Sequence, residues 1–302
     1  MAEIENRIKR LKEEKDVLIL AHYYVDEEVQ KIADCVGDSY YLSEKAVGAK
    51  EKVILFCGVS FMGESAKILN PDKLVLMPDM EADCPMAHMG AVERIEKAKA
   101  EYEDLAVVCY INSTAELKRH CDVCVTSSNA MKIVNALPNK NILFVPDENL
   151  GRYIASKLPD KNFIFNDGYC YVHKEITKQD VLAAKDKWPQ AEVLAHPECT
   201  MAVLEEADYI GSTSGIIARA GESSAQEFII CTETGVFYEL RKNNPHKIFH
   251  PAKEQQVCEG MKKVTLEKVL KVLENMDQTI EMKEDIRKEA QRPLSRMLEL
   301  AK

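Results

Sequence analysis

The sequence predicts an α/β protein built from three repeated units with parallel sheets. Short apolar runs, typical of strands that are buried on both faces, alternate with segments of helical periodicity. Strands that alternate with helices form parallel sheets through right-handed crossovers. Cys84, Cys170 and Cys258 recur 86 and 88 residues apart. This spacing is expected if one structural unit occurs three times, with a cysteine after each copy.

Length and composition agree with this class. A chain of 302 residues can hold two or three units, and its 46% hydrophobic and 30% charged residues are typical of a globular protein. The net charge of −10 argues against a nucleic-acid or anionic-membrane surface. Because no apolar run is long enough to span a membrane and the N-terminus lacks a signal-peptide core, we expect a cytoplasmic protein with reduced thiols.

The first unit begins with an amphipathic helix over residues 3–15. An apolar strand over 17–21 follows and ends in His22-Tyr23-Tyr24. The acidic residues 26–28 suit a first helical turn, and we expect that helix to run to about residue 37. The remaining elements before Cys84 are a helix at about 41–49, a strand over 53–58, a helix through 61–65 and a strand over 74–77.

The same pattern recurs twice more. The second unit has predicted strands over 105–111, 122–125 and 141–145, then an extra helix (149–158) and strand (162–166) before Cys170. The third has strands over 192–195, 208–210, 228–230 and 247–249 before Cys258. A helical tail starts at Thr265, and its last segment, 284–300, is expected to break or restart at Pro293. The predicted units are therefore 1–85, 86–170 and 171–258, with helices in 259–302 packing back on the first.

Polar side chains follow the strand ends in all three units. In doubly wound folds a ligand lies beyond the carboxyl ends of the strands. His, Tyr and Glu can exchange protons there, and hydroxyl-rich turns before helices can bind an anion. For any one hydroxyl alone, a helix N-cap is the favoured interpretation, but recurrence in different units favours binding. The candidates are His22, Tyr24, Ser39, Tyr110, Asn112, Ser127, His196, Glu198, Ser212 and Thr213.

The three repeated cysteines differ from the others because they lie in loops, where side chains can converge. Far-apart thiolates can hold an iron–sulfur cluster, and three thiolates with a water could hold zinc, so the sequence leaves both metals open. His173, three residues after Cys170, could be a ligand or a hydrogen-bonded neighbour.

Other cysteines have simpler interpretations. Cys121 and Cys124 have the spacing of a metal or redox pair, but Cys124 falls in a predicted buried strand, so we interpret the pair as coincidental. Small buried thiols are expected at Cys35, Cys57, Cys109 and Cys231.

Together these residues resemble the quinolinate synthase family of de novo NAD biosynthesis. The resemblance covers essentially the whole chain, and it is specific through the order and spacing of its motifs. Tyr23 departs from the pattern, since many members have Asn there. The motifs include Leu20-Ala21-His22-Tyr23-Tyr24, Gly37-Asp38-Ser39, Cys84-Pro85-Met86-Ala87, Tyr110-Ile111-Asn112, Thr126-Ser127-Ser128-Asn129, His196-Pro197-Glu198-Cys199, Gly211-Ser212-Thr213 and Cys258 with Met261-Lys262.

The resemblance implies a pseudo-threefold protein, with three-layer αβα units around a central active site. It implies a [4Fe–4S] cluster on Cys84, Cys170 and Cys258, with one iron open as a Lewis acid. The implied reaction condenses iminoaspartate (iminosuccinate) with dihydroxyacetone phosphate to quinolinate, phosphate and water. An L-aspartate oxidase could deliver the iminoaspartate by transient contact.

The resemblance also implies residue roles. Tyr24, Glu198 and His196 would be catalytic. Substrate would be bound by His22, Ser39, Tyr110, Ile111, Asn112, Ser127, His196, Pro197, Glu198, Ser212 and Thr213. The alternative is a non-catalytic regulatory or binding protein that depends on zinc or redox state, with the metal on the same cysteines.

Overall fold

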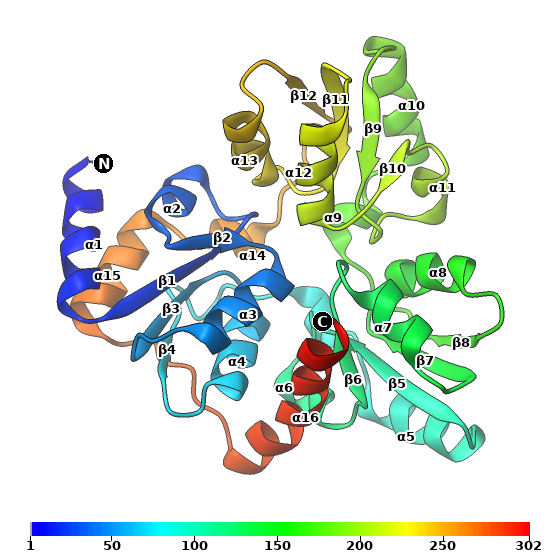
Figure 1. Cartoon of the computed structure of the whole chain (residues 1–302), viewed down its shortest axis with the longest axis horizontal. Helices are drawn as coiled ribbons and strands as arrows, with labels where there is room; N and C mark the ends of the chain where they lie inside the picture. The colour runs from blue at the N-terminus through cyan, green and yellow to red at the C-terminus, as the bar shows by residue number, and fades with distance from the viewer. Residues whose placement is uncertain (1) are drawn as a thin grey trace.

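Residues 2–302, described by a computed structural model, contain three four-stranded parallel sheets (Figure 1). The strand orders are β2-β1-β3-β4, β6-β5-β7-β8 and β10-β9-β11-β12, so the three sheets share one topology. This confirms the α/β class and the repeated unit. The strands are β1 (Val17–His22), β2 (Cys35–Gly37), β3 (Val53–Cys57), β4 (Leu74–Leu76), β5 (Leu105–Tyr110), β6 (Val123–Val125), β7 (Asn141–Val145), β8 (Asn162–Phe165), β9 (Glu192–Ala195), β10 (Tyr209–Ile210), β11 (Glu227–Cys231) and β12 (Ile248–Pro251).

Helices connect the strands and cover the sheets. They are α1 (Ala2–Glu14), α2 (Glu27–Ile32), α3 (Ser39–Gly48), α4 (Ser60–Leu69), η1 (Pro85–His88), α5 (Val92–Glu101), α6 (Ala115–Arg119), α7 (Ala130–Ala136), α8 (Glu148–Lys157), α9 (Tyr171–Lys174), α10 (Lys178–Lys187), α11 (Met201–Leu204), α12 (Thr213–Glu222), α13 (Val236–Asn243), α14 (Glu259–Lys262), α15 (Leu266–Asn275) and α16 (Glu284–Leu300).

The third unit shows most clearly why its strands are apolar throughout. Val193 and Ile229 point to one face of the sheet and pack with Val181 of α10. Leu194 and Phe228 point to the other face, toward helices α12 and α13. Because successive side chains of a strand alternate between faces, both faces need an apolar cover, and the unit is a three-layer αβα sandwich.

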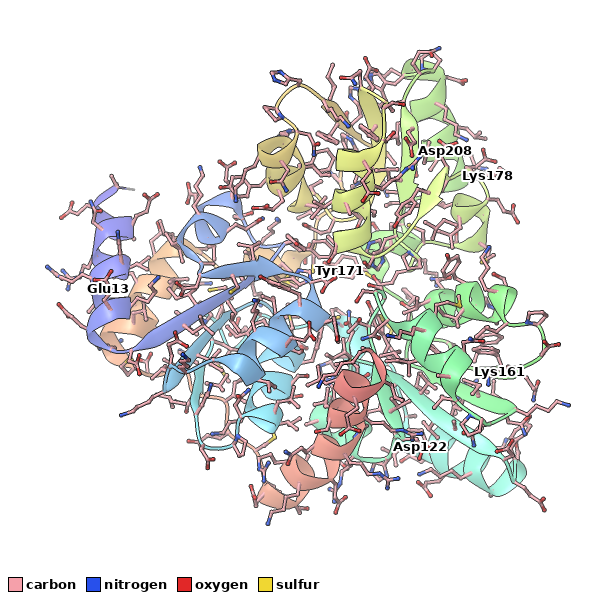
Figure 2. All side chains as sticks on the ribbon, viewed as in Figure 1. Glu13, Asp122, Lys161, Tyr171, Lys178 and Asp208 are labelled. Carbon is pink, nitrogen blue, oxygen red and sulfur yellow. The ribbon has the colours of Figure 1, made fainter. Side chains whose placement is uncertain are left out.

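The repeat extends to single side chains. In each unit an aspartate at the start of the second strand accepts a hydrogen bond from a backbone N–H of the first strand. The pairs are Asp34 with Ile19, Asp122 with Val107, and Asp208 with Val193, each at 2.8 Å (Asp122 and Asp208 are labelled in Figure 2).

A lysine before the fourth strand also recurs. Lys73, Lys161 and Lys247 each donate to two backbone carbonyls at the end of a preceding helix. A cation at that position stabilises a helix C-terminus. The three units thus share individual side-chain hydrogen bonds as well as their strand order.

The C-terminal helices cover two different surfaces. Helix α15 packs against α1 and α2 of the first unit, whereas α16 packs against α4, α6 and β6 (Figure 1). The unit limits 1–85, 86–170 and 171–258 stay a prediction.

Two local predictions were wrong. The helix expected to reach about residue 37 ends at Ile32, and Cys35–Gly37 form strand β2, which pairs with β1. Helix α16 is not broken at Pro293 but continues from Glu284 to Leu300. An interior proline costs about 3 kcal/mol, and packing of the buried Pro293, Leu294 and Met297 offsets it.

The first and third units meet through backbone contacts. Gly235 lies so close to Tyr24 that a Cβ at this position would be 2.6 Å from the Tyr24 Cα. The Gln30 side chain donates to the carbonyls of both Tyr23 and Gly235, at 2.9 and 3.0 Å. These contacts between the first and third units hold the segment that carries Tyr24 in place.

We predict that Asp208→Ala lowers the free energy of unfolding by about 1–3 kcal/mol, because it leaves the Val193 N–H without its acceptor. Asp208→Asn should lose less, since an amide oxygen can still accept. Urea denaturation of both variants measures this, with the exposed Asp160→Ala as control. Equal losses for Asp208→Ala and Asp208→Asn would contradict the hydrogen-bond explanation.

Candidate active site

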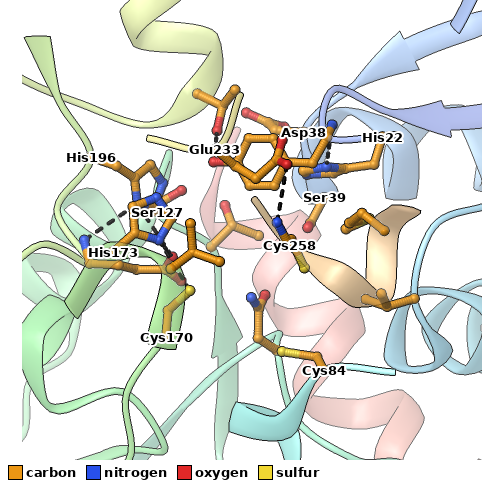
Figure 3. Close-up of a pocket in the computed structure, with 18 of the residues that line it drawn as sticks. His22, Asp38, Ser39, Cys84, Ser127, Cys170, His173, His196, Glu233 and Cys258 are labelled. Atoms are coloured by element: carbon orange, nitrogen blue, oxygen red, sulfur yellow. Dashed lines mark hydrogen bonds and ion pairs between the residues drawn. The ribbon is translucent and has the colours of Figure 1, made fainter. Parts of the chain in front are cut away.

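The carboxyl ends of the strands in all three units face one central pocket (Figures 1 and 3). Its lining includes the predicted residues His22, Tyr24, Ser39, Tyr110, Asn112, Ser127, His196, Glu198 and Thr213, together with Cys84, Cys170 and Cys258.

Equivalent positions of the repeat supply different chemistry. The residue at or just after the end of the first strand is His22, Tyr110 or His196. Two residues further on, the three units carry Tyr24, Asn112 and Glu198. The residue that begins the helix after the second strand, or lies in the turn before it, is Ser39, Ser127 or Thr213.

His22 and His196 are held alike. The His22 Nδ1 accepts from the Tyr24 N–H at 3.2 Å, and the His196 Nδ1 accepts from the Glu198 N–H at 3.3 Å. Burial lowers the pKa of both imidazoles to about 3. Each ring is therefore neutral with its proton on Nε2, and can donate one hydrogen bond without carrying a charge.

Glu198 is the buried carboxylate of the site. Its Oε2 lies 2.8 Å from the His173 Nδ1, and its Oε1 is buried without a partner. Burial acts to raise the pKa of Glu198, but the His173 and His196 rings and the Tyr110 hydroxyl lower it to about 2. Glu198 is thus ionised, with one oxygen free to accept a proton.

Tyr24 belongs to the first unit but is bound by the third. Its hydroxyl lies 2.7 Å from both the Thr213 Oγ1 and the Thr232 Oγ1. The ring packs edge-on against His22, with 4.5 Å between centroids. Burial and the Glu198 charge hold the pKa of Tyr24 well above its ordinary value, so the phenol is protonated.

The second unit contributes Tyr110 and Asn112 to the pocket, and Asn112 has an oxygen that can still accept a hydrogen bond. The Asn112 Oδ1 is buried without a hydrogen-bond partner. Burial and the nearby Glu198 raise the pKa of Tyr110 well above its ordinary value. A buried polar atom without a partner costs stability unless a ligand satisfies it, so Asn112 points to a bound polar group.

The three cysteines occupy matching local structures. Each precedes a four-residue helix: Cys84 before η1, Cys170 before α9, and Cys258 before α14. Backbone N–H groups of these helices act to lower the pKa of each thiol, which favours the thiolate. Figure 3 shows the labelled cysteines on different sides of the same space.

Close backbone contacts bring the cysteine loops together. At Gly260, a Cβ would lie 2.1 Å from the Asp83 carbonyl, so only glycine lets the Cys258 loop touch the Cys84 loop. The buried Glu233 accepts from the Cys258 N–H at 3.1 Å and lies 3.3 Å from the Lys262 ammonium. Sequence reasoning missed Glu233, because its partners lie in other loops.

The donor set fits a metal centre. Burial raises the pKa of all three thiols, and for Cys84 the neighbouring Cys258 adds to the effect. Buried thiols that share a pocket become thiolates when a cation balances their charge. The backbone donors around each sulfur are those expected for a thiolate ligand.

His173 was left open by the sequence and lies within the site. Its Nδ1 is 3.1 Å from the Cys170 Sγ and 2.8 Å from Glu198, and its ring stacks on His196 with 4.6 Å between centroids. Cys170, His173 and Glu198 have ligand atoms within 4.8 Å of one another.

Several other predicted residues lie outside the pocket lining. Ile111, Pro197 and Ser212 are neighbours of lining residues in the chain, but they do not line the pocket. Cys121 and Cys124 are buried free thiols that lie beside Cys109 in the second unit. The Cys199 thiol donates to the Cys231 carbonyl at 3.5 Å.

Fold and site together define an α/β enzyme whose pocket combines the buried carboxylate of Glu198, the neutral rings of His22 and His196, and three thiols suited to a metal. Residues 6–299 match the family described as quinolinate synthetase A protein. The chain belongs to this family, and it is a quinolinate synthase-type enzyme of NAD biosynthesis.

Full-length relatives carry the same name. The chain is 52% identical to "Quinolinate synthase" of Clostridioides difficile, over 98% of this chain and 97% of the relative. It is 53% identical to that of Fusobacterium nucleatum, over 99% of each. It is 48% identical to "Quinolinate synthase 2" of Methanosarcina acetivorans, over 99% of this chain and 96% of the relative. Among residues 2–302, no helix combines the length and apolar character needed to cross a membrane.

We predict that His22 makes the stability of the metal-free protein depend on pH. The pKa of His22 falls from 6.5 to about 3 on folding, so its contribution is complete above pH 6.5 and is lost as the pH falls toward 3. His22→Gln should reduce the slope of unfolding free energy against pH by ~1.4 kcal/mol per unit in this window.

Urea titrations across this pH range measure the slope, and the exposed His246→Gln should leave it unchanged. A His22→Gln protein with the wild-type slope would show that the folded protein protonates His22 as readily as the unfolded chain does.

Proposed function

We propose that this enzyme condenses iminoaspartate with dihydroxyacetone phosphate, releasing phosphate and two waters, to form quinolinate. The observation that carries this proposal is that Cys84, Cys170 and Cys258 line the same pocket as the ionised Glu198 and the protonated Tyr24. Full-length relatives named quinolinate synthase support it.

The same three cysteines would hold a [4Fe–4S] cluster. Tetrahedral zinc with Zn–S bonds of about 2.3 Å requires thiolate sulfurs about 3.8 Å apart. Among the described residues, only Cys170, His173 and Glu198 have ligand atoms that all lie within 4.8 Å of one another, so at least two of the three sulfurs lie farther apart than that. This spacing supports a cluster over a single zinc ion. A bound cluster would supply an open iron that acts as a Lewis acid toward a leaving hydroxyl.

The chain's own groups suit a dianionic substrate. The Nε2–H groups of His22 and His196 and the hydroxyls of Ser39, Ser127 and Thr213 would donate to its carboxylates, with Tyr110 and Asn112 beside them. Neutral donors at helix starts bind an anion without placing a counter-charge in the pocket.

Proton transfer would fall to Glu198 and Tyr24. The unpartnered Glu198 Oε1 is the free base of the site, and His173 holds the other oxygen in place. Tyr24 keeps its proton at neutral pH and would serve acid/base steps, with His196 orienting the substrate beside Glu198.

We also propose a cytoplasmic location and a transient contact with an L-aspartate oxidase that supplies iminoaspartate. All ten cysteines are free, as expected in a reducing compartment. The contact with the oxidase follows from the proposed reaction, which consumes iminoaspartate.

We predict that anaerobically prepared protein contains about four irons with sulfide and forms quinolinate from the two substrates. Cys84→Ser, Cys170→Ser and Cys258→Ser should each lose iron, visible absorption and product. The matched control is Cys35→Ser, a half-buried free cysteine of β2. One zinc per chain without visible absorption, and no quinolinate, would favour the non-catalytic alternative.

We predict that Glu198→Gln keeps its iron but slows turnover by about 10²–10⁴-fold, because an amide cannot take the substrate proton. Quinolinate formation and iron content are measured together, with the exposed Glu205→Gln as control. An undiminished rate would remove Glu198 from the mechanism.

A further inference from the structure

The turn after the third strand of each unit is hydrogen-bonded to the loop that carries the cysteine of that unit. A backbone N–H three residues after β3, β7 or β11 donates to the carbonyl two residues before the cysteine. The pairs are Ser60 with Ala82 at 2.8 Å, Glu148 with Gly168 at 2.8 Å, and Thr234 with Gln256 at 2.9 Å. The same turn therefore holds all three cysteine loops, although each cysteine follows a fourth strand.

The residue before this donor differs between the units. Val59, Asp147 and Glu233 are equivalent, since each lies two residues after a strand that pairs in the same register with the first strand of its unit. Asp147 and Glu233 are fully buried carboxylates. Two of the three turns that hold a cysteine loop thus contain a buried acid, whereas the first unit has a valine at that position.

Glu233 uses both carboxylate oxygens on backbone donors. Its Oε2 accepts from the Gly235 N–H at 2.6 Å, within the turn, and its Oε1 accepts from the Cys258 N–H at 3.1 Å (Figure 3). The Lys262 ammonium lies 3.3 Å from the same Oε1. Because Lys262 belongs to α14, Glu233 holds both the backbone at Cys258 and the helix that follows it.

Asp147 occupies the corresponding place in the second unit, beside Cys170. Its Oδ1 accepts from the Leu150 N–H at 2.8 Å and caps helix α8. Its Oδ2 is buried without a hydrogen-bond partner. Burial and the Glu198 charge raise the pKa of Asp147 well above its ordinary value, while backbone N–H groups, among them that of Cys170, act to lower it. The free oxygen is therefore an acceptor for the Cys170 backbone.

The first unit orders its cysteine loop differently. Asp83, the residue before Cys84, accepts a hydrogen bond from the Ser60 hydroxyl at the start of α4 and lies 2.7 Å from the His88 Nε2. The Asp83 side chain is 41% exposed. In this unit the carboxylate comes from the loop and is open to solvent. The loops of Cys170 and Cys258 are therefore the two that depend on a buried acid in the turn.

We propose that Asp147 and Glu233 are positioning residues that order the Cys170 and Cys258 loops before a metal centre is bound. Each buried acceptor holds the backbone of its cysteine, so that the sulfur already lines the pocket in the metal-free protein. Hydrogen-bond partners of metal ligands typically change metal affinity by about 10–100-fold. The inference rests on the proposed function for the identity of the metal centre, but the order of the two loops is a property of the chain alone.

Substitution at the two positions separates the acceptor from the shape of the side chain. Asp147→Val and Glu233→Val remove the acceptor, and the buried Val59 shows that the turn accommodates a valine. Asp147→Asn and Glu233→Gln keep an amide oxygen that can accept from a backbone N–H. Asp208→Ala is the matched control, since it also removes a backbone acceptor but lies on no cysteine loop.

The first measurement follows metal loss from anaerobically prepared holoenzymes in the presence of an iron chelator. Each valine variant should lose its visible absorption about 10–100-fold faster than wild type, because one cysteine loop is no longer held. The electron paramagnetic resonance spectrum of the reduced enzyme should change in the valine variants. The amide variants and Asp208→Ala should stay within about threefold of the wild-type rate, with an unchanged spectrum.

Hydrogen exchange of the full metal-free chain tests the same loops without the cluster. Glu233→Val should exchange faster over residues 256–262, and Asp147→Val over residues 168–174, because each variant loses local backbone order. Neither loop should change in Asp208→Ala. A wild-type protein that binds no iron or forms no quinolinate would overturn the proposed function, and the exchange data would still test the inference.

Two outcomes would overturn the inference. One is wild-type exchange of its own cysteine loop in either valine variant. The other is an equal rate of metal loss in the valine and amide variants, which would assign the effect to charge or packing. If a valine variant does not fold, Glu233→Asp and Asp147→Ser serve the same comparison with the same outcomes, since a shorter side chain withdraws the acceptor from the cysteine backbone but stays polar.

Discussion

The constraint on which the rest of the structure depends is that three half-buried cysteines from different loops line one pocket. Burial raises the pKa of Cys84, Cys170 and Cys258, so the thiols favour the neutral form until a cation is present. Each sulfur is presented by a different loop before a four-residue helix. The site therefore exists only when the three loops are packed together, and the close contact of Gly260 with Asp83 joins two of them, the Cys258 and Cys84 loops.

The same α/β unit occurs three times in the chain, and some equivalent positions carry different residues in each copy. The aspartates at the second strands and the lysines before the fourth strands are the same in every unit, because they satisfy backbone groups that each copy of the fold exposes. The positions that face the central pocket do not have to satisfy backbone groups of the fold, so their side chains can differ between units. They hold His22, Tyr110 and His196, and the pocket is chemically asymmetric inside a symmetric scaffold.

The charge states of the pocket residues follow from this asymmetry. Two histidines are kept neutral by burial, while Glu198 keeps its charge because His173 and Tyr110 surround it. The pocket therefore combines neutral hydrogen-bond donors with a carboxylate, Glu198, that has an unpartnered oxygen. This combination suits a ligand that has several carboxylates and must also lose a proton. The local hydrogen-bond donors allow an anion to bind although the whole chain carries a net charge of −10.

The sequence by itself determined the α/β class and the three repeats. It also determined the strand-end residues that line the pocket and the three cysteines Cys84, Cys170 and Cys258. These features could be predicted because apolar periodicity is a local signal and fixed spacing is a repeated one. It did not give strand β2, whose three residues form a strand only against β1, or the unbroken α16, whose cost at Pro293 is offset by packing. Nor did it give Glu233, whose partners lie in the Cys258 loop, or the hydrogen bonds of the Tyr24 hydroxyl, which join residues about two hundred positions apart. Both sets of contacts exist only after the loops and units have packed, so only the tertiary structure decided them.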